Sequence, residues 1–127
     1  MADKDNFDAA VVFPGGVFSE TDRHSNCDFN LVLKNGEVYF GIFFTINNLK
    51  LLLEKEEFDG VFWSEELVIL REITPVYIER AILQLLHENM HHKILTRTID
   101  NKDIFETYPY LEETAVFIHI PNEKALL

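Results

Sequence analysis

The segment HENMH, residues 87 to 91, has the spacing of a zinc metallopeptidase motif. In such a motif two histidines four residues apart on one helix bind the metal, and the glutamate between them activates a zinc-bound water. A chain with 5 histidines and 14 glutamates among 127 residues would contain this motif by chance in about 2% of random orders. Whether HENMH is a metal site therefore depends on the helix that carries it.

That helix, expected at about residues 75–89, argues against a metal site. At about 100° per residue, Ile78 and Ile82 lie on the face that packs on the rest of the protein, whereas His87 and His91 lie on the other side. The apolar spacing also ends here, so His91 is expected past the last turn, where the two ligands no longer share one helix face. We expect no catalytic residue, no metal and no cofactor; a zinc site at His87 and His91 is the alternative.

Composition and charge further restrict the classes of function that are possible. The chain has 22 acidic and 11 basic residues and a net charge of −11, which disfavours direct binding to nucleic acid or to an anionic membrane. A basic protein is the natural partner. Cys27 is the only cysteine, so no internal disulfide is possible. The amino terminus has no apolar run, and the longest apolar stretch, residues 38–44, is far shorter than the ~20 residues that span a bilayer. We expect a cytoplasmic protein.

The most definite local structure is a hairpin at Asn35-Gly36, a pair suited to a two-residue turn. Such a turn places Leu31 opposite Phe40 and Phe29 opposite Ile42, which makes one face of the hairpin apolar. The other face carries Tyr39, Gly41 and Phe43. The second strand is therefore expected to be central or covered on both sides, because an open aromatic face would itself be a binding surface.

The remaining elements are expected to surround this hairpin. Strands are predicted at residues 8–14, 67–73 and 114–120, with a weaker one within 91–99 and a loop at 100–111. Helices are predicted at about 46–56, capped by Thr45, and at about 75–89, after Thr74 as cap and Pro75. The sequence predicts one α+β domain over residues 1–127, with residues 1–7 flexible. Its largely antiparallel sheet has about five or six strands, with two main helices packed on it.

Carboxylates and aromatic residues are interleaved at the connections between these elements. One acidic set spans residues 54–66, a second lies at 100–106 and a third at 112–113. In a protein-binding surface, aromatic side chains anchor and charges steer. The residues expected to bind a partner are Glu56, Glu57, Asp59, Phe62, Trp63, Glu65 and Glu66.

The stretches NGEVYFGIFFTINNLKLLLEKEE and FWSEELVILREITPVYIERAILQLL, within residues 35–86, resemble small acidic immunity proteins of polymorphic or contact-dependent bacterial toxin systems. The order of hairpin, Thr-capped helix, Phe-Trp strand and Thr-Pro helix carries the resemblance. It implies a non-enzymatic, cytoplasmic protein that binds and neutralises the catalytic domain of a cognate toxin, often a basic nuclease. Two other classes stay open: a small zinc-dependent hydrolase that uses HENMH, and a scaffold or regulatory subunit that self-associates through the aromatic sheet face.

Overall fold

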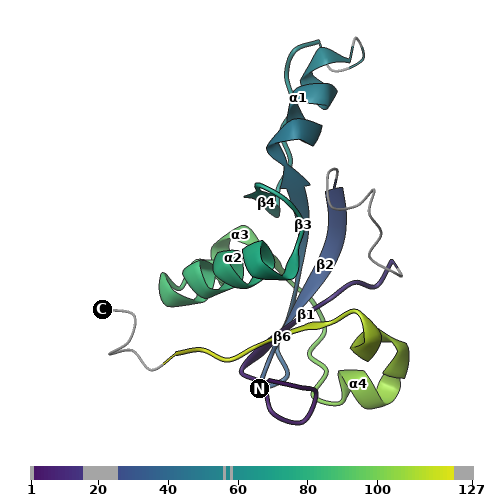
Figure 1. Ribbon diagram of the computed structural model, residues 1–127, viewed down its shortest axis with the longest axis vertical. Helices are drawn as coiled ribbons and strands as arrows, with labels where there is room; N and C mark the ends of the chain where they lie inside the picture. Colours follow the sequence, from purple (N-terminus) through teal and green to yellow (C-terminus); the bar gives the residue numbers. More distant parts are fainter. Residues whose placement is uncertain (1, 16–25, 56, 58, 122–127) are drawn as a thin grey trace.

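The computed structural model describes residues 2–15, 26–55, 57 and 59–121 (Figure 1). Six strands form one sheet in the order β4-β3-β2-β1-β6, with β5 paired to β3 beside β4. The strands are β1 (Ala9–Val12), β2 (Asn26–Leu33), β3 (Val38–Thr45), β4 (Leu67–Leu70), β5 (Thr96–Arg97) and β6 (Val116–Ile118). The helices are α1 (Ile46–Glu54), α2 (Pro75–His87), α3 (His91–Ile94), α4 (Ile104–Thr107) and the 3-10 helix η3 (Pro109–Glu113). The predicted α+β class is confirmed.

Among the described strands, only β3 and β4 run parallel to each other. A parallel neighbour requires a crossover connection of a dozen or more residues, and residues 46–66 supply it with α1 as the helix. All other pairs are antiparallel, so the expectation of a largely antiparallel sheet is also confirmed.

The β2–β3 hairpin turns where the sequence predicts, but its loop is one residue longer. The Gly36 N–H donates to the Leu33 carbonyl at 2.9 Å, and the Leu33 N–H donates to the Glu37 carbonyl at 2.8 Å. Gly36 has a φ of 93°, a conformation that glycine adopts readily. This is a three-residue loop closed by a glycine bulge instead of a two-residue turn.

The longer loop shifts the strand register by one residue. Leu31 lies opposite Tyr39, not opposite Phe40 as predicted. Because side chains alternate along a strand, Leu31 now shares its face with Tyr39 and Phe43, while Phe40 and Ile42 lie on the opposite face. Tyr39 and Phe43 are both buried. The aromatic face is core and is not available for self-association.

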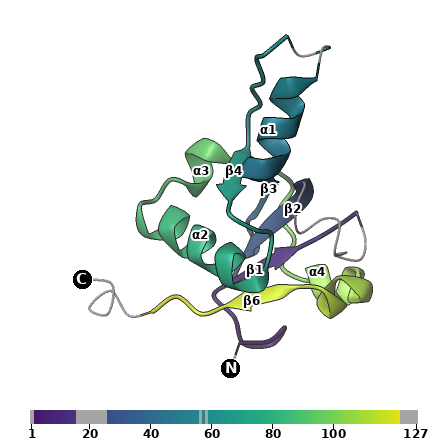
Figure 2. The ribbon, with the colours of Figure 1, turned by 45° about the horizontal axis from the view of Figure 1, so that its top comes forward.

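The sheet has a core on each face, covered by different helices (Figures 1 and 2). α2 covers one face, where Ile78, Ile82 and Leu85 pack against Phe29 and Leu31. α4 and η3 cover part of the other face through buried Ile104 and Leu111. Residues 100–111, expected to be a loop, thus contain helical turns that close the second core.

The amino end of α2 differs in detail from the prediction. Pro75 occupies the first turn, as expected, but the Thr74 side chain makes no capping hydrogen bond. The Thr74 carbonyl instead accepts the Ile78 N–H at 2.9 Å, the ordinary first bond of the helix. Proline itself removes one of the donors that a cap would satisfy.

α1 does not pack on the sheet, contrary to the prediction for both main helices. It projects from the end of β3 (Figure 1), and none of its nine residues, all of which are described, is buried. Thr45 is both the last residue of β3 and the helix cap, where its Oγ1 accepts the Asn48 N–H at 3.1 Å. With no loop between strand and helix, the chain has no room to turn α1 back onto the sheet.

Replacing Thr45 by alanine is expected to lower the free energy of unfolding by about 1 kcal/mol, because it removes the cap of a helix that little else holds. Amide hydrogen exchange in α1 should accelerate more than exchange in α2. Thr45→Ser retains the hydroxyl oxygen and should keep most of the protection. Equal acceleration in both helices would contradict a local role for the cap.

Close packing between β2 and β3 depends on Gly41. Phe29 lies opposite Gly41, and the Phe29 ring stacks on the Phe43 ring with centroids 3.9 Å apart and planes 10° apart. A Cβ atom on Gly41 would lie 2.5 Å from Phe29 Cζ and 2.7 Å from Leu95 Cδ2. The Phe29 ring and the Leu95 side chain thus occupy the space that a side chain at residue 41 would fill.

Candidate functional site: an acidic arm with an exposed tryptophan

The HENMH segment does not form one helical surface. α2 ends at His87, Glu88 is its C-cap, and Asn89 adopts a positive φ of 55°. His91 then begins α3, a separate helix of four residues. His87 is exposed, as predicted, and the prediction that His91 lies past the last turn of α2 is confirmed.

The placement of His91 away from the core was wrong, because the break after α2 turns this residue inward. Its ring meets the buried Tyr39 ring edge to face, with centroids 5.1 Å apart. Its Nδ1 atom is buried without a hydrogen-bond partner. Burial, reinforced by the neighbouring His92, lowers the His91 pKa below 6.5, and Glu37 and the Leu85 carbonyl only partly oppose this.

The lowered pKa predicts a loss of stability in mild acid. The folded state binds a proton at His91 less readily than the unfolded chain does. The free energy of unfolding is therefore highest, as far as His91 is concerned, above pH 6.5, and it decreases as pH falls below that value. Unfolding in urea between pH 7 and 5 should show this loss, whereas His91→Gln should reduce it. His87→Gln, at an exposed position, should retain it.

The measurement should stay above pH 5 so that Glu37 remains ionised. Hydrogen bonds from Asn35 and Tyr39 hold the Glu37 pKa below 4.5, so its own contribution disappears only at lower pH. A His91→Gln profile that parallels the original profile would contradict the assignment to His91.

Exposed apolar side chains are frequent on a projecting segment that we term the arm, residues 46–55, 57 and 59–66. It comprises α1 and the chain that returns to β4 (Figure 2). Five of the eleven exposed large hydrophobic side chains among the described residues belong to it. They are Ile46, Leu51, Leu53, Val61 and Trp63. Trp63, the largest side chain among them, is 80% exposed.

The seven predicted partner-binding residues differ in how accessible they are. Glu57, Asp59, Trp63 and Glu65 are exposed and accessible to a partner. Phe62 is half-buried, with its ring 5.4 Å from the Phe44 ring, so it anchors the returning chain to β3. Glu56 lies outside the described residues.

Glu66 has a structural contact of its own. Its carboxylate accepts a hydrogen bond from the Thr96 hydroxyl at 2.6 Å, and its backbone carbonyl accepts the Ile42 N–H at 2.8 Å. These bonds join the start of β4 to β3 and β5. Glu66 is therefore less available for a partner than the prediction assumed.

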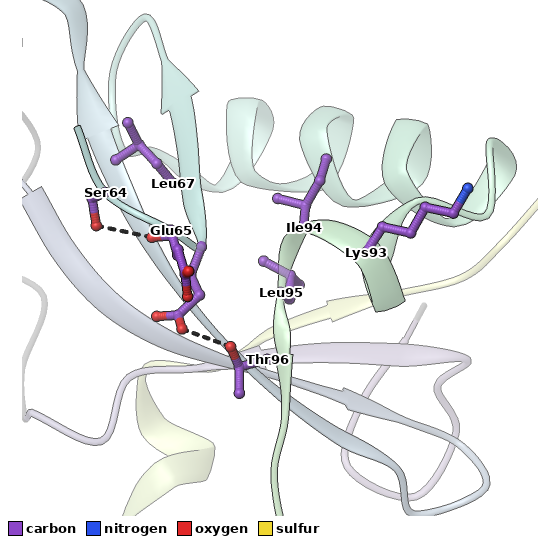
Figure 3. Close-up of a pocket in the computed structure, with 8 residues that line it drawn as sticks. Ser64, Glu65, Leu67, Lys93, Ile94, Leu95 and Thr96 are labelled. Atoms are coloured by element: carbon purple, nitrogen blue, oxygen red, sulfur yellow. Dashed lines mark hydrogen bonds between the residues drawn. The ribbon is translucent and has the colours of Figure 1, made fainter.

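An open hollow of about 470 Å³ adjoins this contact (Figure 3). Ser64, Glu65 and Leu67 line one side, and Ile94 and Leu95 line the other. Figure 3 shows the Lys93 side chain directed away from Glu65. The hollow thus presents carboxylates beside the first residue of β4.

The other acidic sets are partly neutralised within the protein. Arg97 donates to both carboxylate oxygens of Asp100, at 2.8 and 2.9 Å, and Lys4 lies 3.6 Å from Glu112. In the part of the chain that the structure describes, Glu57, Asp59 and Glu65 form no salt bridge. The carboxylates of these three arm residues are therefore not neutralised by a cation within the described part of the protein.

The sequence did not reveal that the leucines of α1 lie on an open helix. Their spacing indicates an apolar stripe but not what the stripe contacts. The direct succession of a strand and its capping residue was the available signal, because a helix with no preceding loop continues away from the sheet.

Within the described residues, no group of three or more His, Cys, Asp or Glu side chains lies close enough to hold a metal ion. No helix in the same part of the chain is long and apolar enough to cross a membrane. No protein-family model, curated protein or solved structure matches this chain.

Proposed function

We propose that this chain is a cytoplasmic immunity protein that binds and neutralises the basic catalytic domain of a cognate bacterial toxin through the arm. The observation that carries the proposal is Trp63, 80% exposed, together with arm carboxylates that form no salt bridge with any described residue. The resemblance of residues 35–86 to toxin immunity proteins gives the partner class. Neutralisation requires binding only, and no catalytic group is assigned to this chain.

The apolar residues of the arm supply affinity. Burying roughly 150 Å² of a tryptophan at about 25 cal/mol per Å² is worth roughly 4 kcal/mol before the costs of association. Two leucines of α1, Leu51 and Leu53, are also exposed on the arm. An aromatic anchor surrounded by aliphatic contacts is the usual composition of an energetic centre in a protein interface.

The carboxylates attract a basic partner and so increase the rate of association. The net charge of −11 and the accessible Glu57, Asp59 and Glu65 favour encounter with a cationic domain. A nuclease must present cationic groups to phosphates, so the surface that attracts its substrate also attracts this arm. Such association is expected to slow as salt rises.

The proposal is tested by co-expression with the C-terminal domain of the protein encoded immediately upstream. The chain should restore growth, form a one-to-one complex with the purified domain and suppress its activity in proportion to the amount bound. A folded chain that neither binds nor protects against that domain would reject the function.

Charge reversal tests the surface separately. Glu57→Lys with Glu65→Lys should slow association about tenfold at low salt and reduce its salt dependence. Asp59 is left unchanged because its φ is 50°, and Glu66 because it bonds Thr96. The matched control reverses two exposed carboxylates of the α2 region that carry the same total charge, Glu79 and Glu88. An equal effect of both pairs would show that net charge acts without the arm.

A further inference from the structure

β4 is an edge strand with unused backbone hydrogen-bonding groups. Among the described residues it pairs only with β3. The Ile42 N–H donates to the Glu66 carbonyl. In a parallel pair every second residue of a strand bonds to the same neighbour, so this bond shows which residues of β4 face β3. Glu66, Val68 and Leu70 direct their backbone groups toward β3, so Leu67 and Ile69 direct theirs away from the sheet.

The side chains of this four-residue edge strand do little to prevent pairing with another strand. Natural sheets place charges, prolines or bulges on exposed edges, but β4 reads Leu-Val-Ile-Leu. Ile69 is 51% exposed and lies on the same face of the sheet as Phe44. A second strand would satisfy the free backbone groups and cover this side chain.

We propose that the occupant of this edge is β4 of a second copy of the chain, paired antiparallel about a twofold axis at Val68. Leu67 of each copy then lies opposite Ile69 of the other, and these two pairs make four backbone hydrogen bonds. Val68 faces its own counterpart as a non-hydrogen-bonded pair, because its backbone groups already bond β3. The two sheets become one continuous sheet.

The sequence around β4 is complementary to itself in this arrangement. Glu65 precedes the strand and Arg71 follows it, so at each end the antiparallel register sets the Glu65 carboxylate opposite the Arg71 guanidinium of the second copy. A parallel pairing would place like charges together. The hollow lined by Glu65 and Leu67 lies at this end of β4 and gives Arg71 of the second copy room to enter (Figure 3).

Cysteine cross-linking tests the register. In a Cys27→Ser background, which removes the natural thiol, Val68→Cys should form a covalent dimer under mild oxidation, because the Cα atoms of a non-hydrogen-bonded pair lie about 4.5 Å apart. Ile69→Cys is the matched variant. It is more exposed but lies off the axis, so it should cross-link more slowly. Faster cross-linking through residue 69 would reject the register.

Sedimentation equilibrium tests the edge without a new thiol. The mass should rise from 14.8 kDa toward twice that value with concentration, and Ile69→Lys should remain monomeric. Val76→Lys, at a 57% exposed position on α2, should behave like the original chain.

A monomer at every concentration would overturn the proposal. If Ile69→Lys then abolished binding to the toxin domain, the edge would belong to that partner instead. Failure of the dimer would leave toxin binding by the arm intact, so the two proposals fail separately.

Discussion

Gly41→Ala is expected to lower the free energy of unfolding by about 2–3 kcal/mol, a large loss for a domain of this size. The new methyl group would overlap the Phe29 ring at 2.5 Å and Leu95 at 2.7 Å. Both neighbours are buried, and the Phe29 ring is stacked on Phe43, so neither has free space to move into. Urea unfolding monitored by circular dichroism measures the change.

Two variants show whether the loss comes from this contact. Gly15→Ala adds the same methyl group where no atom lies within 4 Å, and it should leave stability nearly unchanged. In a Phe29→Leu background the ring no longer covers Gly41, so Gly41→Ala should cost less there than in the original chain. Equal costs in both backgrounds would place the strain elsewhere, with Leu95 as the remaining contact.

Trp63→Ala is expected to weaken binding to the toxin domain by about 2 kcal/mol or more, roughly 30-fold in Kd. The side chain is exposed in the free protein, so folding should be unaffected and the loss should appear in the complex alone. Isothermal titration with the purified domain measures it, and the dissociation rate should carry most of the change.

Tyr110→Ala is the matched control for the tryptophan. Tyr110 is also an exposed aromatic residue, but it lies on η3, away from the arm (Figure 1). Its removal should change Kd less than twofold. If Trp63→Ala had the same small effect while binding persisted, another part of the surface would anchor the toxin.

Local sequence signals predicted the elements well where chemistry at one position decides the structure. Asn35-Gly36 set the turn, Thr45 capped α1, and Pro75 began α2. The register of the hairpin was not predictable in the same way. The loop length depends on whether Gly36 acts as a central turn residue or as a bulge, and both uses require the same amino acid.

The residue types of the candidate site could be predicted from the sequence, but which of its side chains are exposed could not. The acidic and aromatic residues of the arm predict a protein-binding surface, but Phe62 and Glu66 contact the sheet and hold the arm to it. His91 was assigned to the wrong side because helical periodicity was extended through Asn89, where the backbone turns. Such breaks depend on tertiary packing, which a helical projection cannot represent.

α1 has no buried side chain, so substitutions in it can change recognition without changing the stability of the core. Substitutions in a core alter stability and recognition together, whereas α1 contributes no buried residue to the domain. Residues such as Leu51 and Leu53 are therefore free to diversify with little folding penalty. Under the proposed function, substitutions in this helix would alter the surface offered to a toxin while the core of the sheet stays constant.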